Sequence, residues 1–124
     1  MRDSLPRSLS GEERLHLTLQ IISDKKAQNI VGLDMRHLNY LLCDYFVVAT
    51  TESDRQAQAI ADALLEQLKV VEGKHFSYRM EGYETGKWIL VDMGDIVVHL
   101  LQPELRAYYR LEELWGDAKS ISYA

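Results

Sequence analysis

The chain of 124 residues has little of what cross-links or interrupts a protein, with one cysteine and two prolines. The single cysteine, Cys43, excludes an internal disulfide and any metal site built from several cysteines, a usage typical of a reducing compartment. No apolar run approaches the roughly 18 residues of a membrane-spanning helix, and residues 1–10 lack the apolar centre of a signal peptide. These absences predict a cytoplasmic protein that makes no contact with a membrane.

Positive charge is scarce as well. Lys and Arg together number 14 against 19 Asp and Glu, which gives a formal net charge of −5. A mildly acidic protein is poorly suited to wrap duplex nucleic acid through its phosphates, and better suited to dock on a basic protein surface. The 47% hydrophobic and 27% charged residues are ordinary for a soluble globular protein, and the length favours one domain with one core.

The chain is organised around residues 88–101, WILVDMGDIVVHLL. Two runs rich in Ile, Val and Leu are broken once, at MGD, which is typical of two paired strands joined by a tight turn. Because side chains alternate along a strand, Trp88 and Asp92 share one face. Val91 and Met93 share the opposite face. Both faces are mostly apolar, so we expect much of the hairpin to be buried on both sides. The exceptions, where a function is to be sought, are Trp88, Asp92, Asp95 and His99.

Capping signals and apolar periodicity predict three helices. Residues 53–56, SDRQ, are typical of a capping box, and the helix that follows carries an apolar stripe through Leu64 and is ended by Gly73. A similar box, SGEE at residues 10–13, opens an N-terminal helix, and Pro103 suits the first turn of the last helix. The expected helices end at about 26, 72 and 115, and the expected strands are residues 29–35, 44–51, 76–81 and the two arms of the hairpin.

The chain divides into one domain and two tails. Residues 1–9 show no periodicity and are expected to form a flexible N-terminal tail. Residues 10–118 form the single domain, and the polar residues 119–124 are expected to fray as a C-terminal tail. Five strands and three helices, not strictly alternating, predict an α/β fold with a mixed five-stranded sheet flanked by helices.

Three aspartates near strand ends, Asp44, Asp92 and Asp95, are the candidate chemical site. Such acids could hold a divalent cation in a metal-dependent nucleotidyl- or phosphoryl-transfer enzyme. The favoured interpretation is a strand-start acid and two turn residues, because Asp is a common turn former. Metal ligands on one strand would sit at i and i+2, which Asp92 and Asp95 do not, and no glycine-rich phosphate loop precedes a helix. We therefore expect no enzyme, no cofactor and no metal, with the transferase kept as the alternative.

The other reactive side chains have ordinary interpretations. His99 lies within a strand, where a single His is more often a satisfied core or edge residue than a catalyst. Cys43 is expected to be a small, buried or half-buried residue. Asp54 and Arg55 open a helix, and whether they bind an anion or partner, or are plain solvent-exposed residues, is left open.

The chain resembles the ribosomal silencing factor family, also called the RsfS or Iojap family. Each matching motif alone is weak, but their order and spacing are specific, and the resemblance covers residues 15 to 117. The motifs are DYF at 44–46, SDRQ at 53–56, AIAD at 59–62, EG at 81–82, WILVDMGDIVVH at 88–99, and an ending that runs from ELR at 104–106 through Tyr109, LE at 111–112 and LW at 114–115.

The resemblance implies a binding protein without chemistry. Members of the family dock on the large ribosomal subunit, on its ribosomal protein number fourteen, at the face that meets the small subunit. They thereby block subunit joining and repress translation when nutrients are short. The resemblance also implies a fold like that of nucleotidyltransferases, without the transferase motif. No sequence-specific nucleic acid contact is expected, and the oligomeric state, a homodimer included, is left open.

The expected docking patch gathers on the hairpin and the loop before it. A Trp and a Met supply apolar contact, acids suit a basic partner, and glycines permit close approach. Since Trp88 and Asp92 cannot share a strand face with Val91, the patch either wraps the turn or uses one of the two sets. We favour Trp88 and Asp92, with Met93 joining through the turn. The residues expected at or near the patch are Glu81, Gly82, Trp88, Val91, Asp92, Met93 and Asp95.

Overall fold

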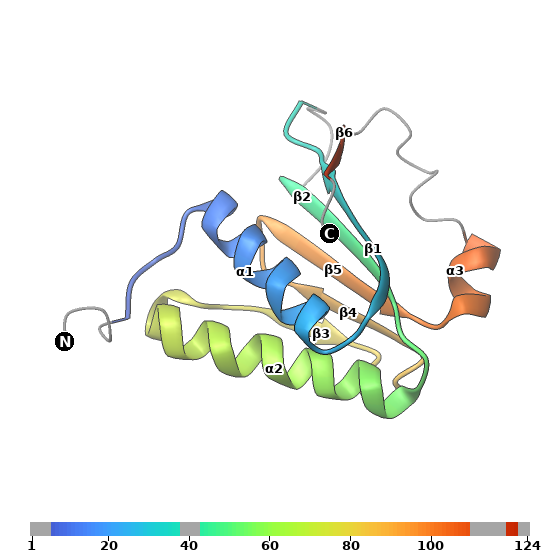
Figure 1. Ribbon diagram of the computed structural model, residues 1–124. Helices are drawn as coiled ribbons and strands as arrows, with labels where there is room; N and C mark the ends of the chain where they lie inside the picture. Colours follow the sequence, from blue (N-terminus) through green and yellow to red (C-terminus); the bar gives the residue numbers. More distant parts are fainter. Residues whose placement is uncertain (1–5, 38–42, 110–118, 122–124) are drawn as a thin grey trace.

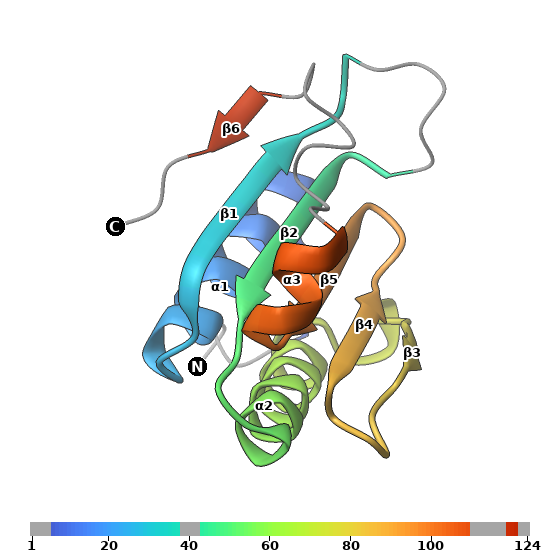
Figure 2. The same cartoon turned by 90° about the vertical axis from the view of Figure 1, so that its right-hand side faces the viewer.

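The computed structural model describes residues 6–37, 43–109 and 119–121 (Figure 1). One six-stranded mixed sheet forms its centre, in the strand order β3-β4-β5-β2-β1-β6. Helices α1 and α2 cover one face of this sheet, and the short helix α3 lies against the other (Figures 1 and 2). The elements in chain order are α1 (Gly11–Asp24), β1 (Gln28–Asp34), β2 (Tyr45–Thr50), α2 (Asp54–Glu72), the 3-10 helix η2 (Gly73–His75), β3 (Arg79–Glu81), β4 (Trp88–Asp92), β5 (Ile96–Leu101), α3 (Pro103–Tyr109) and β6 (Lys119–Ile121).

The predicted α/β fold with a mixed sheet and three helices is confirmed. Strands β2 and β5 pair in parallel, and all other neighbours pair antiparallel, including the predicted β4–β5 hairpin. The part of the last helix predicted beyond residue 109 lies outside the described residues, as do residues 1–5 of the predicted tail. The implied likeness to nucleotidyltransferases is not tested by these elements and stays a prediction.

Both expected tails are partly wrong. Residues 119–121 were expected to fray, but they form β6 and pair antiparallel with β1, which adds a sixth strand to the predicted five. Near the N-terminus, Arg7 N–H donates to the carbonyl oxygen of Val71 at 2.9 Å, and Leu9 is buried in the core. These contacts join segments far apart in the chain, so local periodicity carries no sign of them.

Helix α1 opens on the predicted capping box. The N–H of Glu13 donates to Ser10 Oγ at 3.1 Å, and the N–H of Ser10 donates to Glu13 Oε1 at 2.9 Å. Two of the otherwise unpaired N–H groups at this helix end are thereby satisfied. The acids Glu12 and Glu13 in the first turn also suit the positive end of the helix dipole.

Helix α2 has only half of its predicted box. Ser53 Oγ accepts the N–H of Gln56 at 3.0 Å, but the Gln56 side chain does not return to Ser53. Gln56 Oε1 instead accepts the N–H of Glu52 at 2.7 Å, and its Nε2 donates to the carbonyl oxygens of Lys25 and Lys26. The glutamine therefore fastens the start of α2 to the end of α1, which a capping pattern cannot show.

Two apolar layers hold the sheet. On the helix side, Ile89, Val91 and Met93 of the hairpin pack in one cluster with Ile60 and Leu64 of α2. The smaller cluster on the opposite side is formed by five buried residues and four partly buried ones. The hairpin is therefore packed on both faces, as predicted. The smaller cluster consists of Leu33, Met35, Phe46, Val48 and Leu101, with Val31, Trp88, Val97 and Leu105 partly buried against it.

Candidate docking face

The sheet face turned away from α1 and α2 carries three of the expected docking residues, Glu81, Trp88 and Asp92. Trp88 and Asp92 are half-buried on this face, with the half-buried Leu90 between them. Glu81 lies directly opposite Leu90 in the antiparallel ladder, so its exposed side chain belongs to the same face. This face holds an open hollow of about 320 Å³, which is lined by Glu81, Gly82, Trp88 and Leu90. An aromatic and an apolar side chain thus lie beside carboxylates.

Gly82 is required by the fold itself. Its φ of +82° lies in the left-handed region, and a Cβ at this position would come within 2.0 Å of the Trp88 carbonyl oxygen. The close approach that this glycine permits is therefore to the backbone of β4, on which the tryptophan sits. Any side chain at position 82 would displace that strand end.

Val91 and Met93, which were expected at or near the patch, are not accessible on this face. Val91 is fully buried and Met93 is 6% exposed, both in the core beneath α1 and α2. Alternation separates the two sets correctly, but the apolar set is the one that faces the helices. Of these two alternating sets, Trp88 and Asp92 are therefore the accessible one.

Asp95 is turned towards the helix layer. Its Oδ2 accepts from Arg14 Nη1 at 2.5 Å, and Arg14 also donates to both carboxylate oxygens of Glu72, at 2.9 and 2.6 Å. Glu72 is fully buried, and its Oε1 accepts the N–H of Leu9 as well. Burial alone would raise the pKa of Glu72, but the hydrogen bonds from Arg14 and from Leu9 hold it below its ordinary value. The same hydrogen bond with Glu72 raises the pKa of Arg14.

Arg14 and Glu72 were not among the predicted functional residues. The signal for Glu72 is its position four residues after Leu68, on the buried stripe of α2. A carboxylate on an apolar stripe needs a cation or several donors to be buried. No comparable signal marks Arg14, because its partners come from distant segments.

Two of the three candidate acids, Asp92 and Asp95, take part in a turn and in ion pairs of the fold. Asp92 Oδ1 accepts the N–H of Gly94 at 2.9 Å, as a turn aspartate does, and its Oδ2 lies 3.7 Å from Arg79. Asp44 is exposed at the start of β2. Among the described residues, no three His, Cys, Asp or Glu side chains are grouped so that they could hold a metal ion. The alternative of a metal-dependent transferase therefore gains no support from this geometry.

Trp88 and His99 are joined within the docking face. Trp88 Nε1 donates to His99 Nδ1 at 3.0 Å, and the two ring centroids are 5.9 Å apart. The ring of His99 lies 4.5 Å from that of Phe46 on the next strand. Burial lowers the pKa of His99 to about 4. The prediction of a satisfied core histidine is confirmed, and Cys43 is half-buried, as expected.

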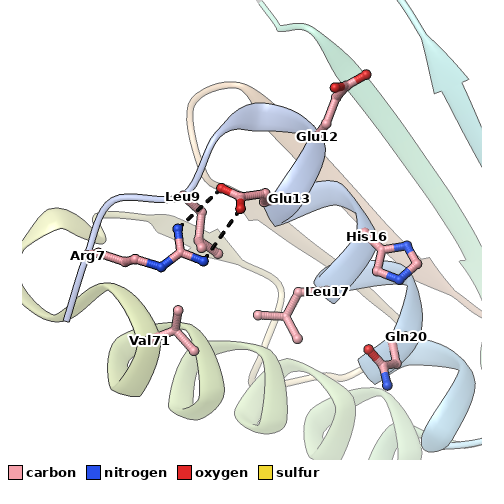
Figure 3. Close-up of a pocket in the computed structure, with 8 residues that line it drawn as sticks. All are labelled: Arg7, Leu9, Glu12, Glu13, His16, Leu17, Gln20 and Val71. Atoms are coloured by element: carbon pink, nitrogen blue, oxygen red, sulfur yellow. Dashed lines mark hydrogen bonds and ion pairs between the residues drawn. The ribbon is translucent and has the colours of Figure 1, made fainter. Parts of the chain in front are cut away.

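A second hollow is lined by none of the predicted docking residues. It has a volume of about 460 Å³ and runs between the N-terminal segment, α1 and the end of α2 (Figure 3). The Arg7 guanidinium spans one end of it to reach Glu13, at 3.4 and 3.5 Å. Its lining residues are Arg7, Leu9, Glu12, Glu13, His16, Leu17, Gln20 and Val71. Within the described part of the chain, no helix is long and apolar enough to cross a membrane.

Comparisons with known proteins agree on one family. A protein of Halalkalibacterium halodurans called ribosomal silencing factor RsfS is 42% identical over 115 residues, which cover 91% of this chain and 94% of that protein. A protein of the same name from Bacillus subtilis is 41% identical over 104 residues, 84% of this chain and 86% of that protein. A crystal structure of a Chromobacterium violaceum protein is similar with a TM-score of 0.79 and 36% identity, covering 94% of this chain and 93% of that one. The sequence model of the family described as "Ribosomal silencing factor during starvation" matches residues 8–124. The chain therefore belongs to the ribosomal silencing factor family, as its motifs predicted.

Proposed function

We propose that the protein binds the large ribosomal subunit through its ribosomal protein number fourteen and blocks joining of the small subunit. Translation is thereby repressed when nutrients are short. Membership of the silencing factor family supports the ribosome as the target. The steric mechanism needs no catalytic group. It needs only a bound protein that occupies the area where the small subunit would make contact.

The observation that carries the proposal is the docking face formed by Trp88, Leu90, Asp92 and Glu81. In protein interfaces a few residues contribute most of the binding energy, and tryptophan is enriched among them. The acids at its edge suit a basic protein and speed its association. The net charge of −5 adds a weak long-range attraction to a basic partner.

The test is co-sedimentation of the purified protein with isolated large subunits, followed by a subunit-joining assay. Trp88→Ala should weaken binding by about thirtyfold, since a buried interfacial tryptophan contributes about 2 kcal/mol. Val70→Ala is the control, because Val70 is an apolar side chain that is 70% exposed on α2, on the other side of the sheet. Both variants must keep the circular dichroism spectrum of the wild type.

A charge reversal tests the same face and leaves the Trp88 ring in place. Glu81→Lys and Glu66→Lys change the net charge equally, and both glutamates are exposed, but Glu66 lies on α2. Glu81→Lys should slow association more than Glu66→Lys, and the difference should shrink as salt is added. Equal effects of the two reversals, together with a folded Trp88→Ala that binds like the wild type, would place the docking surface elsewhere.

A further inference from the structure

Trp88 is oriented by a neighbouring strand before any partner arrives. In the antiparallel register of β4 and β5, Leu101 lies opposite Trp88, and His99 lies opposite Leu90. The indole therefore reaches diagonally across the ladder to His99, where its N–H donates to Nδ1 at 3.0 Å. This bond restrains the rotation of a ring that also packs, partly buried, against the smaller apolar cluster.

His99 is itself held in place. It is 6% exposed, and its backbone pairs with β2 on one side, opposite Val48, and with β4 on the other. Its ring packs against Phe46 at a centroid distance of 4.5 Å. A side chain anchored on a central strand with aromatic neighbours cannot turn away from the indole without disturbing the core.

The chemistry of the bond requires a neutral imidazole. An imidazolium carries a proton on both nitrogens and has no acceptor to offer to an indole N–H. Burial lowers the pKa of His99 to about 4, so the imidazole is neutral near pH 7 and Nδ1 accepts. Nδ1 of His99 is therefore available as the acceptor near neutral pH, where the protein would bind a ribosome.

We infer that His99 is a positioning residue for docking, which holds the Trp88 indole in the orientation that the partner meets. This inference rests on the proposed function, because it assumes that the same face docks on the large subunit. A side chain already fixed in its bound orientation loses less freedom on binding, which is worth roughly three- to tenfold in affinity. His99 itself makes no contact with the partner.

The test is a double-variant cycle on the affinity for isolated large subunits. His99→Phe keeps a flat ring of similar size and removes the acceptor, whereas Trp88→Phe keeps an aromatic ring and removes the N–H. His99→Phe should lower the affinity roughly three- to tenfold in the wild-type background. In the Trp88→Phe background it should cause no further loss, because no N–H remains to be held. A purely structural role would lower the affinity by the same factor in both backgrounds and would overturn the inference.

A measurement without a partner completes the test. The indole N–H resonance of Trp88, identified by its disappearance in Trp88→Phe, should exchange slowly with deuterated water in the wild type and faster in His99→Phe. Fast exchange in the wild type would overturn the inference even if a variant failed to fold. A wild-type protein that does not bind large subunits overturns the proposed function and the inference with it. A wild type that binds, together with a His99→Phe variant that binds equally well, overturns the inference alone.

Discussion

The buried imidazole of His99 makes the stability of the protein depend on pH. Its pKa falls from 6.5 to about 4 on folding, because burial disfavours the charged ring. The unfolded chain therefore binds a proton between these values that the folded chain does not, so the free energy of unfolding decreases as pH falls through this range. From pH 7 to pH 5 we expect His99 to contribute a loss of about 2 kcal/mol.

Denaturant unfolding at the two pH values measures this loss. His99→Phe should lose less stability than the wild type on acidification, since its ring does not titrate. His16→Gln is the matched control, because His16 is exposed on α1, and this variant should follow the wild type. A His99→Phe variant with the full pH dependence of the wild type would show that other groups cause it.

Alternation predicted which residues of the hairpin share a face, but not which face meets the helices. Both sets are apolar enough to be buried, so the pattern allows either the Trp88 face or the Val91 face to lie against the helices. The structure decides it through the helix-side core, where Val91 packs under α2. The bond from Trp88 to His99 follows from strand register, which a single sequence does not contain.

At the scale of elements, the apolar stripe of α2 fixes how this helix lies on the sheet. The predicted helix over residues 53–72 is confirmed as Asp54–Glu72, and Leu64 at its middle is fully buried. Leu64→Ala should lower the free energy of unfolding by about 2–5 kcal/mol, because it leaves a cavity in a packed core. Denaturant unfolding followed by circular dichroism measures the change.

The outer face of the same helix provides the control. Val70 is 70% exposed, so Val70→Ala should change stability by less than about 0.5 kcal/mol. Similar losses in both variants would contradict the assignment of the buried stripe. The capping signal was less informative than the stripe, because Gln56 uses its side chain on the end of α1 and not on Ser53.

For the whole molecule, the contacts that local patterns miss are those that close the fold. Strand β6 joins the edge of the sheet at β1, and the segment before α1 packs against the end of α2. Pairing of this kind depends on where the chain returns in space. A polar stretch such as residues 119–121 can therefore supply a strand although its sequence shows no strand pattern.

The ion-pair network of Arg14, Glu72 and Asp95 connects three parts of the molecule: α1, the end of α2 and the hairpin turn. Arg14 is 11% exposed, Glu72 is fully buried and Asp95 is 25% exposed. Removing the cation would leave a carboxylate buried without its partner, which costs about 3–5 kcal/mol. Arg14→Met should therefore destabilise the protein by about this amount in denaturant unfolding.

A second substitution separates the ion pair from simple packing. Glu72→Gln added to Arg14→Met removes the buried charge and keeps an acceptor for the Leu9 N–H, so the double variant should regain much of the lost stability. Arg7→Met is the matched control, because the Arg7–Glu13 pair is 61% and 49% exposed and should contribute at most about 1 kcal/mol. If Arg14→Met costs no more than Arg7→Met, the three charges do not hold the helices to the hairpin. If the double variant is no more stable than Arg14→Met alone, the loss comes from the packing of the arginine side chain and not from an unpaired Glu72.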